Sequence, residues 1–330
     1  MRIVGTTLVH HLLTEKEAFA PVLTQISLGA KLIGRELQQA GLVNMLGYTG
    51  GMNVQGEKVK KLDLWANDAF VEILKESGLV CTLISEEMDE PLHFNDYCKE
   101  GSYLVCFDPI DGSSNIDVNG ALGTIFSVRR RRGKEADHMR PDALEKGTEQ
   151  VAAGYVMYGT GTILVYTTGR GVNGFTLDPN IGEFFLSHPN IQAPKRGKTY
   201  SVNEGNYHHW HPQSRKFIDH LREIDKASGR PYSLRYTGAL VADFHRTLLE
   251  GGIYLYPADA DDPKKPTGKL RLLYEAAPLG FVMEVAGGKA STGEMRILDI
   301  QPSSYHQRVP LIIGSAEDVT MAEDFYQGRR

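Results

Sequence analysis

Two short apolar runs in this chain each end in acidic side chains. Residues 79–87 read LVCTLISEE, and residues 102–111 read SYLVCFDPID. Apolar, partly β-branched runs of this length, bounded by polar residues, are typical of buried strands. The sequence therefore predicts two strands that deliver carboxylates at their carboxyl ends, and the fold must accept that much negative charge beside its core.

The second run continues into a turn that combines acidic, flexible and hydroxyl residues. A proline follows Asp108 and disfavours helical angles in the residue before it, so we expect Asp108 to end the strand. Asp111, three residues later around a tight turn, can point to the same side. Gly112 permits close approach of the backbone, and Ser113 and Ser114 can cap a following helix and offer amide hydrogens to an anion.

Three interpretations of this turn compete. A calcium loop of the EF-hand type fails, because counting from Asp108 places Asn119 where the bidentate glutamate belongs. A solvent-facing acidic turn stays open, since Asp-Pro and Asp-Gly are common turn dipeptides. The third interpretation is a site for metal and phosphate, because carboxylates beside an anion-binding turn repel the anion unless a divalent cation lies between them.

The end of the first run favours the metal interpretation. Glu86 and Glu87 are adjacent, so at the end of a strand their side chains point in different directions. One of them can bind a metal ion while the other handles a proton. Oxygen ligands without nearby histidine or cysteine favour magnesium or manganese over zinc. Taken alone, the same glutamates could also be the polar end of a strand.

The composition argues against several classes of partner. The net charge is -5, with basic and acidic residues mixed along the chain, so we expect neither nucleic acid nor an anionic membrane surface as a partner. Residues 150–169 carry no charge, but their glycines and threonines predict a β-hairpin and not a membrane helix. At 41% hydrophobic residues, the 330-residue chain can bury a large core.

The cysteines and the N-terminus predict a cytoplasmic protein. Cys81, Cys98 and Cys106 are an odd number without C-x-x-C spacing, which suits reduced thiols better than a disulfide framework. The first residues lack the uninterrupted apolar stretch of a signal peptide.

The remaining pattern predicts two domains. Helical spacing indicates helices over residues 19–41 and 62–78, separated by a glycine-rich mobile loop at 42–61. Further strands up to residue 188 suggest a large, mostly antiparallel sheet, interrupted by an exposed connection at 129–150. Later segments predict helices at 212–224, 239–251 and 270–288. We place the domains at 1–190 and 191–330.

Three motifs together resemble a known family. LISEE, CFDPIDGSSNID and GKLRLLYEAAPLG resemble the class I fructose-1,6-bisphosphatases, within the superfamily of magnesium-dependent, lithium-sensitive phosphatases. The first two motifs would fit the whole superfamily, including inositol monophosphatases, whereas the third is more specific. The likeness covers nearly everything after residue 28. It implies an α/β layered sandwich, α-β-α-β-α, with two subdomains and the active site between them.

The resemblance also implies a role for each site residue. It implies two or more Mg²⁺ ions, with Mn²⁺ possible, held by Glu86, Asp108, the Ile110 carbonyl, Asp111 and Glu275. The 1-phosphate would lie on Gly112, Ser113 and Ser114. The catalytic acids that orient and deprotonate the attacking water would be Glu87 and Asp63, with Glu57 in a loop that closes over the metals. The sugar and the 6-phosphate would be bound by Asn203, Tyr207, Tyr236, Tyr256, Lys269 and Arg235, the last lent across a subunit interface.

The function that the resemblance implies is hydrolysis of the 1-phosphate of fructose 1,6-bisphosphate, giving fructose 6-phosphate and phosphate. It implies a homotetramer acting in gluconeogenesis or the Calvin cycle. One alternative is a sedoheptulose-1,7-bisphosphatase or a dual-specificity enzyme, and a remote one is a non-catalytic regulator that binds phosphosugars. Two departures from the family pattern stand out: the turn and lysine of the AMP pocket are missing, and Asn206 precedes Tyr207.

Overall fold

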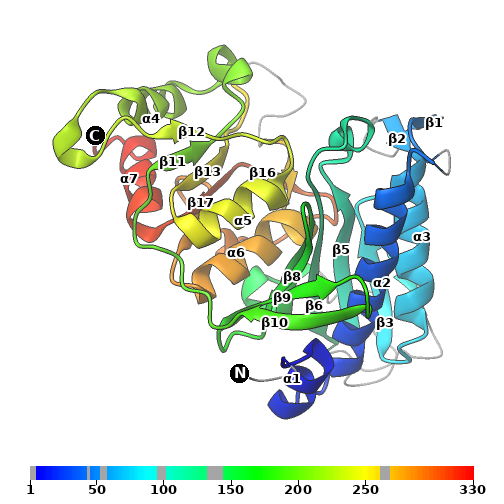
Figure 1. Cartoon of the computed structure of the whole chain (residues 1–330). Helices are drawn as coiled ribbons and strands as arrows, with labels where there is room; N and C mark the ends of the chain where they lie inside the picture. The colour runs from blue at the N-terminus through cyan, green and yellow to red at the C-terminus, as the bar shows by residue number, and fades with distance from the viewer. Residues whose placement is uncertain (1–4, 43–44, 53–57, 95–101, 132–143, 261–267) are drawn as a thin grey trace.

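The protein is described here from a computed structural model, which covers residues 5–42, 45–52, 58–94, 102–131, 144–260 and 268–330. Its described elements form five layers in the order helices, sheet, helices, sheet, helices (Figure 1). This is the expected α-β-α-β-α sandwich, so the predicted fold class is confirmed.

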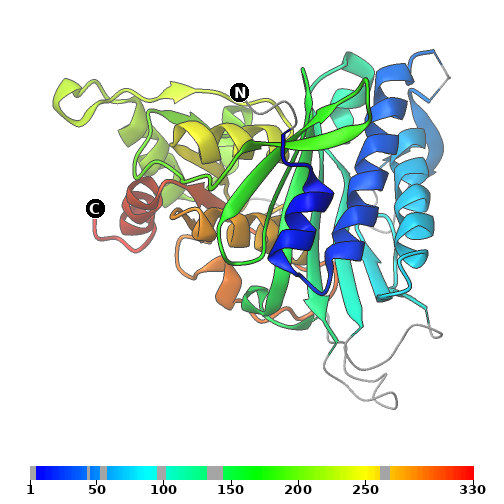
Figure 2. The same cartoon turned by 60° about the horizontal axis from the view of Figure 1, so that its bottom comes forward.

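The first layer contains three helices, seen at the N-terminal end of the colour scale in Figures 1 and 2: α1 (Leu8–Glu15), α2 (Ala20–Gln39) and α3 (Lys61–Lys75). The two longer helices confirm the helical spacing. They pack against each other, and α3 packs on strands of the first sheet. Gly29 of α2 meets the ring of Phe70 of α3 so closely that a Cβ there would lie 2.8 Å from a ring carbon. The glycine therefore sets how near the two helices can come.

The described strands of the second layer form an eight-stranded sheet in the order β10-β9-β8-β7-β6-β5-β3-β4. Their bounds are β3 (Val80–Ser85), β4 (Leu92–His93), β5 (Tyr103–Asp111), β6 (Leu122–Arg130), β7 (Gln150–Tyr158), β8 (Thr162–Thr167), β9 (Val172–Asp178) and β10 (Glu183–His188). Described neighbours are antiparallel except β3 and β5, which run parallel. The predicted carboxylate-tipped strands are thus adjacent, and their carboxyl ends lie at one edge. The predicted hairpin is confirmed as β7 and β8.

The stretch predicted as an exposed connection, residues 129–150, is partly wrong. Arg129 belongs to β6 and is only 1% exposed, and Gln150 begins β7 and is buried. The two residues lie opposite each other in the ladder. Backbone pairing therefore extends farther at both ends than the polar side chains suggested, and residues 132–143 lie outside the described part.

The middle layer contains α5 (Leu240–Glu250) and α6 (Ala277–Val285), which contact strands of both sheets. A single long helix over 270–288 is wrong. The segment begins with β14 (Leu270–Arg271), continues as the π-helix η7 (Leu272–Ala276) and only then enters α6. Pro278 lies in the first turn of α6, where its missing N–H is tolerated, and it cannot donate back into the preceding turn. That turn is free to take the wider form that carries Glu275.

The second sheet has the described order β12-β11-β13-β17-β15 and is covered by α4 (Pro212–Arg222) and α7 (Ala316–Tyr326). Its strands are β11 (Thr199–Ser201), β12 (Ser233–Leu234), β13 (Ile253–Tyr256), β15 (Lys289–Ser291) and β17 (Leu311–Gly314). A separate two-stranded ladder joins β14 to β16 (Arg308–Val309).

The loop predicted at 42–61 has some regular structure, because β1 (Tyr48–Met52) and β2 (Lys58–Lys60) pair antiparallel. Its catalytic candidate Glu57 lies outside the described residues. Within the described ranges, no helix combines the length and the hydrophobicity that a bilayer crossing requires.

The expectation of reduced thiols is wrong for one cysteine. Cys81 is disulfide-bonded, whereas Cys106 is free and buried. An odd count without a motif cannot reveal a pair that tertiary folding brings together. The inference of a reducing compartment from cysteine usage therefore loses its basis.

Candidate active site

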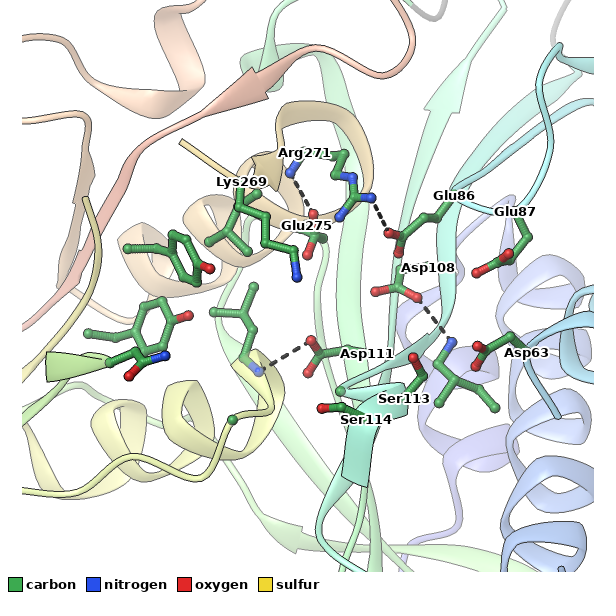
Figure 3. Close-up of a pocket in the computed structure, with 18 of the residues that line it drawn as sticks. Asp63, Glu86, Glu87, Asp108, Asp111, Ser113, Ser114, Lys269, Arg271 and Glu275 are labelled. Atoms are coloured by element: carbon green, nitrogen blue, oxygen red, sulfur yellow. Dashed lines mark hydrogen bonds and ion pairs between the residues drawn. The ribbon is translucent and has the colours of Figure 1, made fainter. Parts of the chain in front are cut away.

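A cavity of about 430 Å³ receives side chains from both halves of the chain (Figure 3). Most of the expected site residues line it. They are Asp63, Glu86, Glu87, Asp108, Ile110, Asp111, Gly112, Ser113, Ser114, Asn203, Tyr236, Tyr256, Lys269 and Glu275. Residues separated by more than 200 positions in the sequence thus share one site.

Three buried carboxylates form the core of this cavity. One oxygen each from Asp108, Asp111 and Glu275 lies within 4.8 Å of the others. Burial raises the pKa of Asp111 to about 7 and that of Glu275 to about 8, and neighbouring carboxylates including Glu86 add to both shifts. Burial, together with the negative charge of Glu86, Asp111 and Glu275, raises the pKa of Asp108 well above its usual range. Charge of this density needs protons or a cation for compensation.

Asp108 and Asp111 face the same side, but both belong to strand β5, whereas a turn after Asp108 was expected. The strand does not end at Asp108 but continues to Asp111, and its pairing with β6 is irregular between these residues. Ile110 N donates to Asp108 Oδ1 at 3.0 Å, and Thr124 Oγ1 donates to the carbonyl oxygen of Pro109 at 2.8 Å. This local irregularity removes the strict alternation of a strand, so Asp108 and Asp111 can both face the cavity.

The turn after β5 depends on a glycine. Gly112 has a φ of 79°, and a Cβ there would lie 2.5 Å from Ala239 Cβ. Gly112 is the N-cap of the 3₁₀-helix η2 (Ser113–Val118), so the expectation that the serines cap a helix is wrong. Ser113 and Ser114 instead form its first turn and line the cavity. A left-handed residue followed by helical ones turns backbone amides toward one side, which suits an anion.

Asp111 is also held from the far side of the cavity. Leu240 N donates to its Oδ1 at 3.2 Å, and Val241 N donates to its Oδ2 at 2.7 Å. These donors favour the ionised carboxylate and offset part of the pKa rise that burial causes. The start of α5 thus fixes the orientation of a residue that β5 supplies.

Asp63 occupies the first turn of α3 and is 4% exposed. Its Oδ2 accepts a hydrogen bond from Lys60 N at 3.4 Å, while within the described part of the chain its Oδ1 has no partner. Burial raises its pKa to about 7. In Figure 3 Asp63 and Glu87 lie on the same side of Asp108, away from Glu275. The cavity therefore has a separate acidic corner beside its carboxylate core.

Arg271 is a site residue that the sequence interpretation missed. It is 3% exposed, its Nη2 lies 2.9 Å from Glu86 Oε1, and its backbone N donates to Glu275 Oε2 at 2.5 Å (Figure 3). Its positive charge lowers the pKa of Glu275 against the stronger effect of burial. The signal was present, since an arginine inside the apolar run LRLLYEAA needs a buried partner.

The opposite end of the cavity is less acidic. Figure 3 shows Lys269 on the far side of Asp108 from Asp63 and Glu87, with its side chain pointing inward. Asn203, Tyr236 and Tyr256 also line the cavity, as expected. Tyr254 also lines it and was not foreseen, although its spacing from Tyr256 on β13 places both on one face of the strand. This end offers phenols, an amide and a cation.

Two expected residues lie elsewhere. Tyr207 donates from its hydroxyl to Asp219 Oδ2 at 2.7 Å. Arg235 is exposed, and its Nη1 donates to Leu234 O at 2.8 Å. Neither lines the cavity in the described part of the chain.

The carboxylate core fits a hard divalent cation. Its donors are oxygens, they are buried, and their ionised forms repel one another unless positive charge lies between them. Arg271 supplies only part of that charge. The chemistry of the donors thus suits Mg²⁺ or Mn²⁺ better than a thiophilic metal.

Comparison with known proteins identifies the family. A model described as "Fructose-1-6-bisphosphatase, N-terminal domain" matches residues 5–189, and one described as "Fructose-1-6-bisphosphatase, C-terminal domain" matches residues 193–327. A "Fructose-1,6-bisphosphatase class 1" from Maridesulfovibrio salexigens is 50% identical over 329 residues, covering 98% of this chain and 97% of the relative. Another from Chloroherpeton thalassium is 54% identical over 313 residues, covering 94% and 88%.

A solved structure agrees. The holo form of Leishmania major fructose-1,6-bisphosphatase matches with a TM-score of 0.91 at 43% identity, covering 98% of this chain and 99% of that one. With both family models and near-complete relatives matched, the chain belongs to the fructose-1,6-bisphosphatase family.

Proposed function

We propose that this protein hydrolyses the 1-phosphate of fructose 1,6-bisphosphate, releasing fructose 6-phosphate and phosphate. The buried cluster of Asp108, Asp111 and Glu275 beside the Gly112 turn carries the proposal. The family and its named relatives supply the substrate.

The carboxylate core would hold the metal ions, two or more of Mg²⁺ or Mn²⁺. Glu86, Asp108, Asp111 and Glu275 would be side-chain ligands, together with the Ile110 carbonyl. Bound there, the cations would neutralise charge on the transferring phosphoryl group. Gly112, Ser113 and Ser114 would receive the phosphoryl oxygens through backbone amides and hydroxyls.

The acidic corner would handle the attacking water. Glu87 and Asp63 line the cavity next to the proposed ligands, where they can orient a water and accept its proton. A carboxylate whose pKa lies near the working pH suits a general base, and that of Asp63 is about 7 before any cation binds. Glu57, outside the described residues, would join them when its loop closes.

The less acidic end would bind the sugar and its 6-phosphate. Lys269 would supply a cation, and Asn203, Tyr236 and Tyr256 would supply hydrogen-bond donors. Arg235, exposed and outside this cavity, is free to reach the site of a neighbouring subunit in a homotetramer. Tyr207 would need to give up its bond to Asp219 to join them.

Phosphate release tests this proposal. The assay would compare fructose 1,6-bisphosphate, sedoheptulose 1,7-bisphosphate and inositol 1-phosphate, each with Mg²⁺ and with chelator. We expect the highest kcat/KM for fructose 1,6-bisphosphate, and no turnover under chelation. Asp111→Asn and Glu275→Gln should each lower kcat by about a thousand-fold or more, since each removes a charge that the transition state requires. Full activity in these variants, or in chelator, would refute the proposal.

A further inference from the structure

His306 connects the segment that carries Glu275 with the turn that carries Glu86 and Glu87. Tyr274 Oη lies 2.6 Å from His306 Nδ1, and His306 Nε2 lies 3.3 Å from the backbone carbonyl oxygen of Asp89. Tyr274 directly precedes Glu275, and Asp89 follows the Glu86–Glu87 pair by two residues. One imidazole thus connects the turns that carry these carboxylates.

The chemistry of the bridge fixes the tautomer of the imidazole. A carbonyl oxygen can only accept, so Nε2 must carry the proton and donate to Asp89. In the neutral imidazole Nδ1 is then the acceptor, and the Tyr274 hydroxyl donates to it. A neutral imidazole with one donor and one acceptor satisfies both contacts.

On the Glu275 side, the bridge is anchored in regular structure. Tyr274 is fully buried within η7. The segment that carries His306 leads into β16, which pairs with β14, and Leu272 N donates to Gln307 O at 2.8 Å. His306 is therefore anchored on the same side as Glu275, and it reaches across to the turn after β3.

A second contact also joins the Glu275 segment to the Glu86–Glu87 turn, but it uses a proposed metal ligand. Arg271 pairs with Glu86, and a cation that takes this carboxylate competes with the guanidinium. The bridge through His306 involves a phenol, an imidazole and a backbone carbonyl, none of them a proposed ligand. It can therefore persist when metal binds, whereas the ion pair must weaken.

We propose that His306 is a positioning residue that aligns the Glu86–Glu87 turn with Glu275, so that carboxylates from both halves of the chain are spaced for divalent cations before these bind. The inference rests on the proposed function. Residues that orient metal ligands commonly change metal affinity by about ten- to a hundred-fold when removed.

The test measures metal binding without turnover. Mn²⁺ affinity of the substrate-free protein would be measured by calorimetry for wild type, His306→Ala and Tyr305→Phe. Tyr305 is a matched control, since it neighbours His306 in sequence and its hydroxyl does not take part in the bridge. We expect about ten-fold or more weaker binding for His306→Ala and wild-type affinity for the control. The sugar KM and kcat at saturating Mg²⁺ should change by less than about three-fold, because the bridge touches neither substrate nor reacting atoms.

Two further variants separate positioning from general damage. His306→Gln offers an acceptor and a donor, so it should recover part of the affinity. Tyr274→Phe removes only the phenolic bond, and combined with His306→Ala it should add little further loss, as expected for one shared interaction. Tyr274→Phe also decides the question if His306→Ala does not fold.

The outcomes are distinguishable. If wild type binds no Mn²⁺, the proposed metal site fails, and this inference with it. If wild type binds Mn²⁺ and both His306→Ala and Tyr274→Phe bind it equally well, only the role of His306 is overturned. Loss of affinity that His306→Gln does not restore, with additive effects of the two single changes, would also contradict positioning through the bridge.

Discussion

The side chain of Asp117, in the 3₁₀-helix that follows Gly112, contacts both Lys60 and Gly47. Lys60 Nζ lies 2.8 Å from Asp117 Oδ2, and Gly47 N donates to Asp117 Oδ1 at 3.0 Å. The ammonium group is nearly buried, with 3% of the Lys60 side chain exposed. Asp117 belongs to η2, which begins with Ser113, so one carboxylate holds both ends of segment 47–60 beside the active site.

Replacing Asp117 with Asn should loosen this segment. The variant leaves the Lys60 ammonium without its counter-charge, and about 1 kcal/mol of stability should be lost, a modest value because Asp117 itself is partly exposed. Limited proteolysis should cut between residues 47 and 60 several-fold faster. Asp178→Asn, a half-buried aspartate at the end of β9, is the matched control. Equal cleavage of all three proteins would show that the ion pair does not restrain the segment.

Replacing Gly112 with Ala should damage both stability and catalysis. The new Cβ would be strained at a φ of 79° and would clash with Ala239. We expect a loss of about 3 kcal/mol or more, measured by urea unfolding, and a kcat reduced by at least about a hundred-fold.

Gly182→Ala is the control for that experiment. Gly182 has a similar φ of 68°, but a Cβ there would meet nothing within 4 Å. It should lose only about 1 kcal/mol and keep full activity. Equal losses of stability in both variants would mean that backbone strain alone, and not the contact with Ala239, limits position 112.

Much of the fold followed from local sequence. Glu86 and Asp108 end regular, strongly apolar runs, and such runs determine a strand wherever it packs. Because these two strands are parallel neighbours in the sheet, their carboxyl ends lie together, and so do the carboxylates that they carry. The chemistry of the turn after β5 pointed to metal and phosphate before any tertiary contact was known.

The rest depended on long-range contacts that no local pattern encodes. The disulfide of Cys81 needs two segments to meet in space. The π turn around Glu275 reflects Pro278 together with packing on the eight-stranded sheet and on the β14–β16 ladder. Arg271 fell inside a predicted helix with no role assigned, and its role emerged only when Glu86, nearly 200 residues earlier, was found beside it. Serines 113 and 114 were given a capping role that the left-handed Gly112 already fills.

Replacing Arg271 with Met should increase the number of protons that the carboxylates release when Mg²⁺ binds. Without the guanidinium, Glu86 loses its partner and the pKa of Glu275 should rise further, because the charge that lowers it is gone. Protons released on Mg²⁺ binding at pH 7, counted by calorimetry in two buffers of different ionisation enthalpy, should increase. Arg271→Lys keeps the charge and should stay closer to wild type. An unchanged proton count in Arg271→Met would show that the guanidinium does not govern ionisation at this site.

The stability of the metal-free protein should fall as pH rises. Asp63 and Asp111 have a pKa of about 7 in the folded protein against an ordinary value of 3.8, and Glu275 has a pKa of about 8 against an ordinary value of 4.5. Between the two values the folded state binds more protons than the unfolded state, so the free energy of unfolding decreases with pH through this interval.

This loss should disappear when metal replaces the protons. In chelator, Tm should drop steadily between about pH 5 and pH 8. With saturating Mg²⁺ the curve should be flatter and higher at its alkaline end, because the cation binds only the ionised carboxylates and only in the folded state. Glu275→Gln removes one of the repelling groups, so it should unfold at a higher temperature than wild type in chelator at pH 8 and gain less from Mg²⁺. A wild-type Tm in chelator that rises with pH across this range would contradict the assigned protonation of the cluster.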